Sequence, residues 1–220
     1  AGILFQVPHR FFRKEAQNAA RSYRKKATTA SPCSFCRKMP GVKDAKRVFE
    51  EGCAACGMPL LFWRQVPVDP HDLGSTAQAC MPTIMQAFLG RPDGVEAGDD
   101  LNAPVYMRRT IEKRADACPA LEGKIFYACS MSSRTIVYKG MLVATQMRRF
   151  YTDLNDAAVK TAVALVHSRY STNTTPSWSA RTPIDSSSTT ARSTRLGNVN
   201  WIAPASQTCH SPVLQGDLDR

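Results

Sequence analysis

Four cysteines within the first sixty residues have the spacing of a metal site. Cys33 and Cys36 form one Cys-x-x-Cys pair, Cys53 and Cys56 form a second, and sixteen residues separate the pairs. Four thiolates at this spacing can hold zinc in tetrahedral geometry. Residues 21–40 carry six basic residues and no acidic one, so one interpretation is a zinc-ribbon nucleic-acid-binding protein.

The second cysteine pair also has a simpler interpretation. Apolar side chains recur at helical spacing from residue 43 onward, and Gly57 follows as a stop signal, which predicts a helix over residues 43–56. Cys53 and Cys56 would then lie in the last helical turn. A zinc knuckle needs a tight turn that directs both sulfurs at one ion, so we expect idle thiols and keep zinc as the alternative.

A second polar group directly follows an apolar run. Residues 161–166 are mostly apolar, which predicts a strand buried on both faces, and the sequence His-Ser-Arg-Tyr-Ser-Thr-Asn follows from His167 to Asn173. Polar side chains at a strand end are well placed to line a binding site. The guanidinium of Arg169 suits a carboxylate, because its planar fork donates two parallel hydrogen bonds.

The elements that must position these groups are strands and helices in mixed order. Because they do not alternate strictly, an α+β fold is predicted. Apolar and β-branched runs predict strands at residues 3–7, 60–68, 87–89, 105–108, 124–129, 134–138 and 161–166. Helical periodicity predicts helices from Pro8 onward and at residues 43–56, 75–80, 111–117 and 141–151.

Composition and charge narrow the class of protein. Hydrophobic residues make up 43% and charged residues 21% of the chain, as in ordinary soluble domains. No apolar run is long enough to cross a bilayer, and the first residues lack a signal-peptide pattern, so we expect a cytoplasmic protein with unpaired cysteines. The net charge of +11 depends strongly on residues 21–40. Without that stretch, nothing in the composition favours nucleic acid or a membrane.

Several longer segments carry a more specific signal. They are AGILFQVPHRFF at the start, WRQVPVD from residue 63, FYACSMSSRTIVYKGML from residue 126, ALVHSRYSTNTTPSW from residue 164, GNVNW from residue 197, and SPVLQGDLD near the end. In this order they resemble the class II glutamine amidotransferase domain of glutamate synthase. The resemblance covers nearly all of residues 1–220, which we interpret as a partial domain of this type.

The resemblance implies a fold and a reaction. The fold is an N-terminal-nucleophile hydrolase type four-layer αββα sandwich, here incomplete, and the reaction is hydrolysis of L-glutamine to L-glutamate and ammonia. In the parent enzyme, ammonia then serves the reductive amination of 2-oxoglutarate in domains that carry FMN and an iron–sulfur cluster. The implied partners are those domains and a small electron-donating subunit. Electrons would come from NADPH or ferredoxin, and the location would be cytoplasm or plastid.

The resemblance also implies roles for individual residues. Arg169 matches the arginine that pairs with the α-carboxylate of glutamine, and Thr172 and Asn173 match residues that line the same pocket. His167 is expected to be structural. Thr175 stands where the family usually has Phe.

The catalytic groups of the family are not found in this sequence. The family's nucleophile is an N-terminal cysteine, and none of the eight cysteines after Ala1 matches it. A His-Asn-Gly-Glu-Ile-Asn oxyanion motif is expected between the segments ending in PSW and beginning with GNVNW, and it is absent. No catalytic residue is therefore assigned, and the chain by itself is expected to be inactive.

A change of reading frame accounts for the missing motif. Residues 179–196 are rich in Ser, Thr and Arg and have the composition of a linker. With suitable synonymous codons and one restored base, residues 178–195 become W-E-R-A-H-P-N-R-F-I-V-H-N-G-E-I-N-T. That sequence contains the oxyanion motif, so we hypothesise that residues 179–196 are out of frame.

The same operation applies to residues 22–40, whose basic, non-periodic sequence also predicts a linker or disorder. Shifted by one base, this stretch becomes P-E-E-G-H-Y-G-V-A-M-L-F-L-P-Q-D-A, which resembles a glycine-rich loop and a buried strand of the family. On this hypothesis Cys33, Cys36 and the basic patch are products of the wrong frame. If the written sequence is real, a core strand has become polar.

Overall fold

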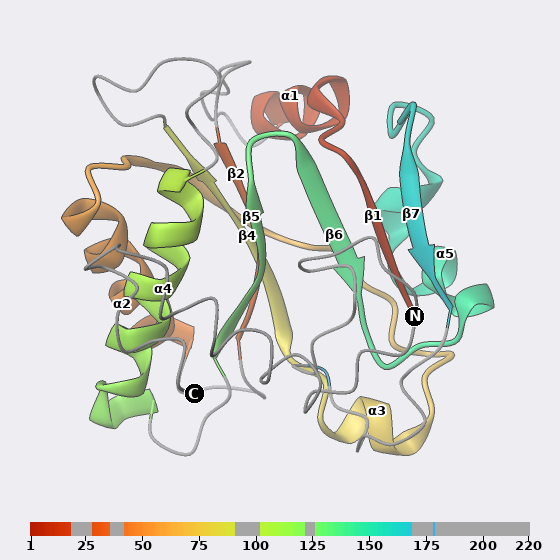
Figure 1. Cartoon of the computed structure of the whole chain (residues 1–220). Helices are drawn as coiled ribbons and strands as arrows, with labels where there is room; N and C mark the ends of the chain where they lie inside the picture. The colour runs from red at the N-terminus through yellow and green to blue at the C-terminus, as the bar shows by residue number, and fades with distance from the viewer. Residues whose placement is uncertain (19–27, 36–41, 91–101, 122–125, 169–177, 179–220) are drawn as a thin grey trace, which may run out of the picture.

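The computed structural model describes residues 1–18, 28–35, 42–90, 102–121, 126–168 and 178. These residues form two antiparallel sheets with helices beside them (Figure 1). The α+β prediction is therefore confirmed. No helix in the described part of the chain is long and apolar enough to cross a membrane.

The smaller sheet has three strands in the order β6-β1-β7. Its central strand β1 (Gly2–Gln6) runs antiparallel to β6 (Thr135–Lys139) on one side and to β7 (Ala164–His167) on the other. The register of the sheet places Phe5 opposite Ile136 in β6 and opposite Ala164 in β7.

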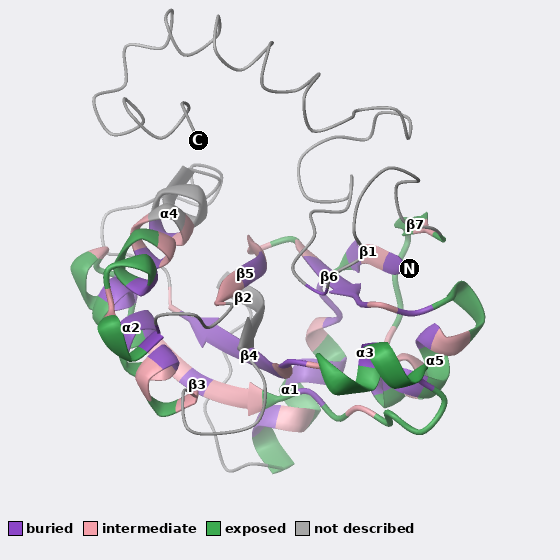
Figure 2. Ribbon diagram, turned by 90° about the horizontal axis from the view of Figure 1, so that it is seen from below, coloured by how far each residue is buried: buried purple, intermediate pink, exposed green. Residues whose placement is uncertain are grey.

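The larger sheet has four strands in the order β3-β4-β2-β5. The strands are β3 (Leu60–Gln65), β4 (Thr83–Leu89), β2 (Thr28–Phe35) and β5 (Tyr127–Ser132). Figure 2 shows β4 coloured as buried along its length, and every residue after Thr83 is buried. Both faces of β4 are therefore covered.

Strand β2 corrects the prediction that residues 22–40 form a linker or disordered segment. Residues 28–35 instead pair with β4 on one side and β5 on the other. The register with β4 shifts between Ala30 and Cys33, across Pro32. Proline has no N–H to give to a ladder, and bulges are where sheets tolerate it. The neighbours, rather than the pattern of the strand's own residues, specify this strand.

Two helices cover the outer face of the four-stranded sheet. They are α2 (Val42–Ala55) and α4 (Asn102–Asp116), which Figure 1 shows side by side. They approach closely at Gly52, where an added Cβ would lie 2.5 Å from Cγ1 of Ile111. A second apolar core fills the space between these helices and the sheet.

Helix α4 corrects the predicted strand at residues 105–108. Local β-branched and aromatic residues favour a strand there, but Met107, Ile111 and Ala115 recur every four residues and are buried in the same core. Helical periodicity over the longer segment outweighs the local propensity.

The remaining helical pieces are short except for α1 (His9–Asn18), which follows Pro8 as predicted. Most other predicted strands and helices are present, with ends displaced by a few residues, and the helix expected at residues 141–151 is broken into short pieces. Those short elements are α3 (Ser75–Ala79), α5 (Met147–Phe150) and the 3₁₀ turns η1 (Pro119–Leu121), η2 (Ala144–Gln146) and η3 (Thr152–Asn155).

The main apolar core lies between the two sheets. Aromatic side chains dominate it: Phe62 of β3 stacks on Phe88 of β4 at 4.3 Å, and Phe12 of α1 meets Phe88 at 5.1 Å. Tyr138 of β6 enters the same core and stacks on Tyr151 at 4.7 Å. The described residues thus form three layers: α2 with α4, the four-stranded sheet, and the three-stranded sheet.

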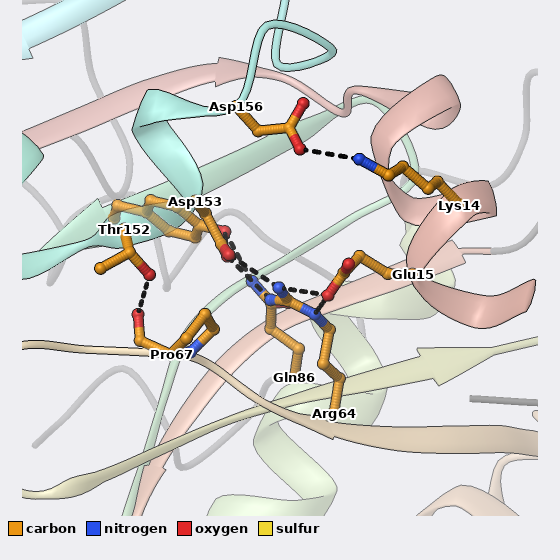
Figure 3. Close-up of polar contacts among 9 residues, drawn as sticks. Lys14, Glu15, Arg64, Pro67, Gln86, Thr152, Asp153 and Asp156 are labelled. Carbon is orange, nitrogen blue, oxygen red and sulfur yellow. Dashed lines mark hydrogen bonds and ion pairs between the residues drawn. The ribbon is translucent and has the colours of Figure 1, made fainter. Parts of the chain in front are cut away.

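A charged group lies at the edge of this core. The Arg64 side chain in β3 is only 9% exposed, and its guanidinium uses all five N–H donors (Figure 3). Two go to Asp153 at 2.7 and 2.8 Å, two to Glu15 at 2.8 and 3.0 Å, and one to Gln86 at 3.0 Å.

Tyr138 extends this cluster into the second sheet. Its hydroxyl donates to Asp153 at 2.8 Å and accepts from Gln86 at 3.1 Å. Burial, followed by the charge of Asp153, raises the pKa of Tyr138 far above its usual range, so the phenol stays neutral. Burial opposes the charge of Arg64, but its bonds to Asp153 and Glu15 raise its pKa above the ordinary value. Arg64 therefore stays positively charged because Asp153 and Glu15 stabilise its guanidinium.

We expect Arg64→Met to lower the free energy of unfolding by about 3–5 kcal/mol, because it leaves the buried carboxylate of Asp153 without its cation. Urea unfolding followed by circular dichroism measures this. Lys14→Met is the matched control, since Lys14 pairs with Asp156 at an exposed position. Equal stabilities of the two variants would show that the buried cluster does not stabilise the fold.

Candidate functional site

The predicted substrate-binding residues Arg169, Thr172 and Asn173 lie outside the described residues, within 169–177. The structure describes both flanks of this segment. Strand β7 and Ser168 lead into it, and Trp178 follows it. We therefore describe the candidate site through the residues on its two sides, Ser168 and Trp178.

Strand β7 precedes residues 169–177 and lies at the edge of the described three-stranded sheet. Its pairing with β1 aligns His167 with Gly2 and Val166 with Ile3. The predicted strand is thus confirmed, but its predicted burial on both faces is wrong. Val163 and Val166 are 65% and 63% exposed, because β1 is the only strand beside β7 among the described residues (Figure 2).

His167 is the last residue of β7 and stands two positions before Arg169. Its Nδ1 is buried and has no hydrogen-bond partner within the described ranges. Burial lowers the pKa of His167, which favours the neutral imidazole. A neutral ring beside the strand end agrees with the structural role expected for it, and that role stays a prediction.

Trp178 fixes the other end of the segment. Its side chain is buried, and the indole Nε1 donates to the carbonyl of Ala77 in α3 at 3.1 Å. Its own carbonyl accepts from the hydroxyl of Tyr127 in β5 at 2.6 Å. The ring lies 5.7 Å from that of Phe150 in α5. Contacts with three elements thus hold this residue in place.

Gly140 makes room for the indole. A Cβ at this position would lie 2.5 Å from Cζ3 of Trp178, closer than side chains approach. Gly140 directly follows β6, whose last residue Lys139 accepts a hydrogen bond from Tyr151 at 2.6 Å through its backbone carbonyl. Because Gly140 has no side chain, the indole of Trp178 can lie directly against the backbone at the end of β6.

Both ends of residues 169–177 are thus attached to packed elements. The predicted binding residues Arg169, Thr172 and Asn173 lie between these two anchors in the sequence. Sequence analysis did not identify the anchoring role of Trp178 or Gly140, although the aromatic residue at the end of the motif was a usable signal.

The cysteines do not support the alternative zinc site. Cys53 is 2% exposed inside α2 and packs in the helix–sheet core. Burial raises its pKa to about 12, and burial also raises the pKa of Cys56. Cys53 therefore fills the core as a protonated thiol.

The structure describes only one cysteine of the first pair. Cys33 lies in β2, and Cys36 lies outside the described residues. Within the described part of the chain, no group of three or more His, Cys, Asp or Glu side chains could hold a metal ion.

Comparison with known proteins gives one family. The model of the family "Glutamine amidotransferases class-II" matches residues 1–220. Over its whole length the chain is 35% identical to the glutamate synthase [NADPH] large chain of Bacillus subtilis and 33% identical to the glutamate synthase [NADH] of Saccharomyces cerevisiae. Over 80% of its length it is 35% identical to the chloroplastic ferredoxin-dependent glutamate synthase of Oryza sativa.

These relatives are much longer than the chain. The alignments cover 14% of the Bacillus protein and 11% of each of the other two. The matched part is thus a small fraction of each relative.

Gly140→Ala should destabilise the protein by about 1–3 kcal/mol, because the new methyl group displaces the Trp178 ring. Gly74→Ala is the control, since a Cβ at Gly74 meets no atom within 4 Å. Urea unfolding of both variants provides the comparison. If the two variants are equally stable, Trp178 is not docked on Gly140.

The cysteines should differ in reactivity. In the absence of denaturant, iodoacetamide should modify the exposed Cys80 and spare Cys53, whose thiol is buried and protonated. Peptide mass spectrometry after timed alkylation reads out both sites. Equal rates at the two cysteines, or one tightly held zinc per purified chain, would contradict this description of Cys53.

Proposed function

Because the chain belongs to the class II glutamine amidotransferases, we propose that it is part of the glutaminase domain of a glutamate synthase. In this proposal the domain uses water to hydrolyse L-glutamine to L-glutamate and ammonia. The family match over residues 1–220 is the observation that carries the proposal. Strand β7 and Trp178 support it, because they fix both ends of the segment expected to bind glutamine.

We assign glutamine binding to Arg169, with Thr172 and Asn173 lining the same pocket. The guanidinium of Arg169 donates two hydrogen bonds to the α-carboxylate of glutamine. That carboxylate is distant from the amide that reacts, so this contact orients the substrate. The two smaller polar side chains supply further hydrogen bonds to the bound amino acid.

We assign no chemical step to a residue of this chain. Cys53 and Cys56 are poor candidates for the nucleophile, because burial raises the pKa of each thiol and a nucleophilic cysteine must be a thiolate. We therefore propose that the residues of this chain bind glutamine and that none of them carries out the chemical step. Release of ammonia by the chain as written would contradict that part of the proposal.

We further propose the four-layer αββα sandwich of N-terminal-nucleophile hydrolases. Two features support it. The two antiparallel sheets share one apolar core, and α2 and α4 cover the outer face of the larger sheet. The fourth layer would be helices on the outer face of the sheet formed by β6, β1 and β7.

For the parent enzyme we propose reductive amination of 2-oxoglutarate by the released ammonia. FMN and an iron–sulfur cluster would lie in its other domains, and a small subunit would supply electrons. The names of the relatives include NADPH, NADH and ferredoxin as donors, and their identities of 35%, 33% and 35% do not separate these classes. A cytoplasmic or plastid location fits names from bacteria and from chloroplasts.

Arg169→Ala should weaken L-glutamine binding at least about 10-fold, because a hydrogen bond to a charged group contributes roughly 1.5–3 kcal/mol. Isothermal titration calorimetry measures the dissociation constant. Arg169→Lys should fall between the two, since lysine keeps the charge and loses the fork. Arg148→Ala, at an exposed position of α5, is the control.

A second ligand identifies the contact that is lost. 4-Aminobutanamide has the side-chain amide of glutamine and a free amine but no α-carboxylate, so Arg169→Ala should not change its affinity. An equal loss for both ligands would mean that Arg169 supports the loop rather than the carboxylate. Unchanged glutamine binding would refute the assignment of Arg169.

A further inference from the structure

Strand β2 occupies the most demanding position of the larger sheet. Its residues 28–35 have a hydrogen-bonded neighbour on each side, β4 and β5. The register runs from Thr28 opposite Leu89 to Phe35 opposite Thr83. A strand with two neighbours needs N–H and C=O groups available to both.

The burial of β4 and β5, the two strands paired with β2, indicates which residues suit a strand at this position. Along β4, Ile84 and Phe88 point into the core between the sheets, whereas Met85, Ala87 and Leu89 point into the core beneath α2 and α4. In β5, Ala128 and Cys129 are buried as well. Strands whose two faces are both covered are normally continuous apolar runs.

The written sequence of β2 conflicts with this requirement. It is Thr-Thr-Ala-Ser-Pro-Cys-Ser-Phe, in which half of the residues are hydroxyl-bearing. Pro32 lies between the paired residues Ser31 and Cys33, and neither ladder includes it. Proline is normally confined to sheet edges and bulges, and polar side chains are costly in a covered sheet.

We propose that the natural protein carries the apolar run Tyr-Gly-Val-Ala-Met-Leu-Phe-Leu at β2, and that the written residues come from a one-base shift of the reading frame. With the synonymous codons that yield this run, its eight codons begin in the codon of Thr28 and end in that of Cys36. When residues 24–40 are replaced, the run occupies residues 29–36 and so covers strand β2 (Thr28–Phe35) except for its first residue.

The strand and the run overlap over seven residues. The bounds of the strand come from backbone pairing with β4 and β5, whereas the bounds of the run come from the synonymous codons chosen for the shifted frame. In the shifted frame a methionine codon overlaps that of Pro32, so the missing donor is restored. Pro-Glu-Glu-Gly-His precedes the run and Pro-Gln-Asp-Ala follows it, and both flanks contain residues that end strands. The inference does not rest on glutamine hydrolysis.

The stability test uses two versions of the 220-residue chain. In the first, residues 24–40 are replaced by the seventeen recovered residues. In the second, only residues 24–27 and 37–40 are replaced, which removes most of the basic patch and leaves the written strand. We expect the first version to unfold cooperatively, at least about 5 °C above the written chain, and the second to show little gain.

The comparison separates strand packing from charge. If the second version gains as much as the first, removal of the positive charge explains the effect and the inference fails. It also fails if the first version is no more stable than the written chain. A chain as written that shows no cooperative transition, beside a first version that shows one, supports the inference.

Peptide mass spectrometry of the protein from its natural source decides the matter without a folding measurement. The written sequence predicts the tryptic peptide ATTASPCSFCR from residues 27–37. The recovered sequence has no Lys or Arg in that stretch and predicts a peptide containing GHYGVAMLFLPQDA. Detection of the first peptide would overturn the proposal, and detection of the second would establish it.

Discussion

The buried guanidinium of Arg64 is the constraint on which the arrangement of the two sheets depends. A charge in an apolar core is tolerated only when every donor has a partner, and Arg64 finds its partners on α1, β4 and η3. Asp153 then accepts from Tyr138 of β6. These elements must therefore approach from fixed directions, because displacing one would leave a buried charge exposed to apolar surroundings.

The same cluster leads structurally to the candidate site. Tyr138 is fixed by Asp153 and Gln86, and two residues later Gly140 provides the flat surface on which Trp178 docks. Trp178 ends the segment that is expected to bind glutamine, and β7, paired with β1 of the same sheet, begins it. The buried polar cluster is thus linked, through the three-stranded sheet, to the described residues on both sides of that segment.

Sequence patterns predicted elements whose specification is local. Helix α2 and strand β6 follow from periodicity and β-branched runs, and both are found within a residue of the expected ends. The Arg64 cluster could not be predicted, because its members are up to 138 residues apart; the usable signal was an arginine inside the apolar run Leu-Leu-Phe-Trp-Arg-Gln. Arg169 came from a motif alone, since charge and spacing do not distinguish it from a surface arginine.

Strands β2 and β7 deviate from expectation in opposite directions. β2 has a polar sequence in the middle of a sheet, whereas Val166 of β7 and the preceding Val163 are exposed at the edge of the described three-stranded sheet. Both situations are unfavourable, since apolar side chains gain from burial and polar ones lose. β2 lies in one of the two stretches that a frame shift would alter, and the other stretch follows β7. With the synonymous codons chosen for it, that second stretch contains the apolar run Phe-Ile-Val-His. In the proposed reading frame, β2 would therefore have the apolar interior that a strand with two hydrogen-bonded neighbours favours.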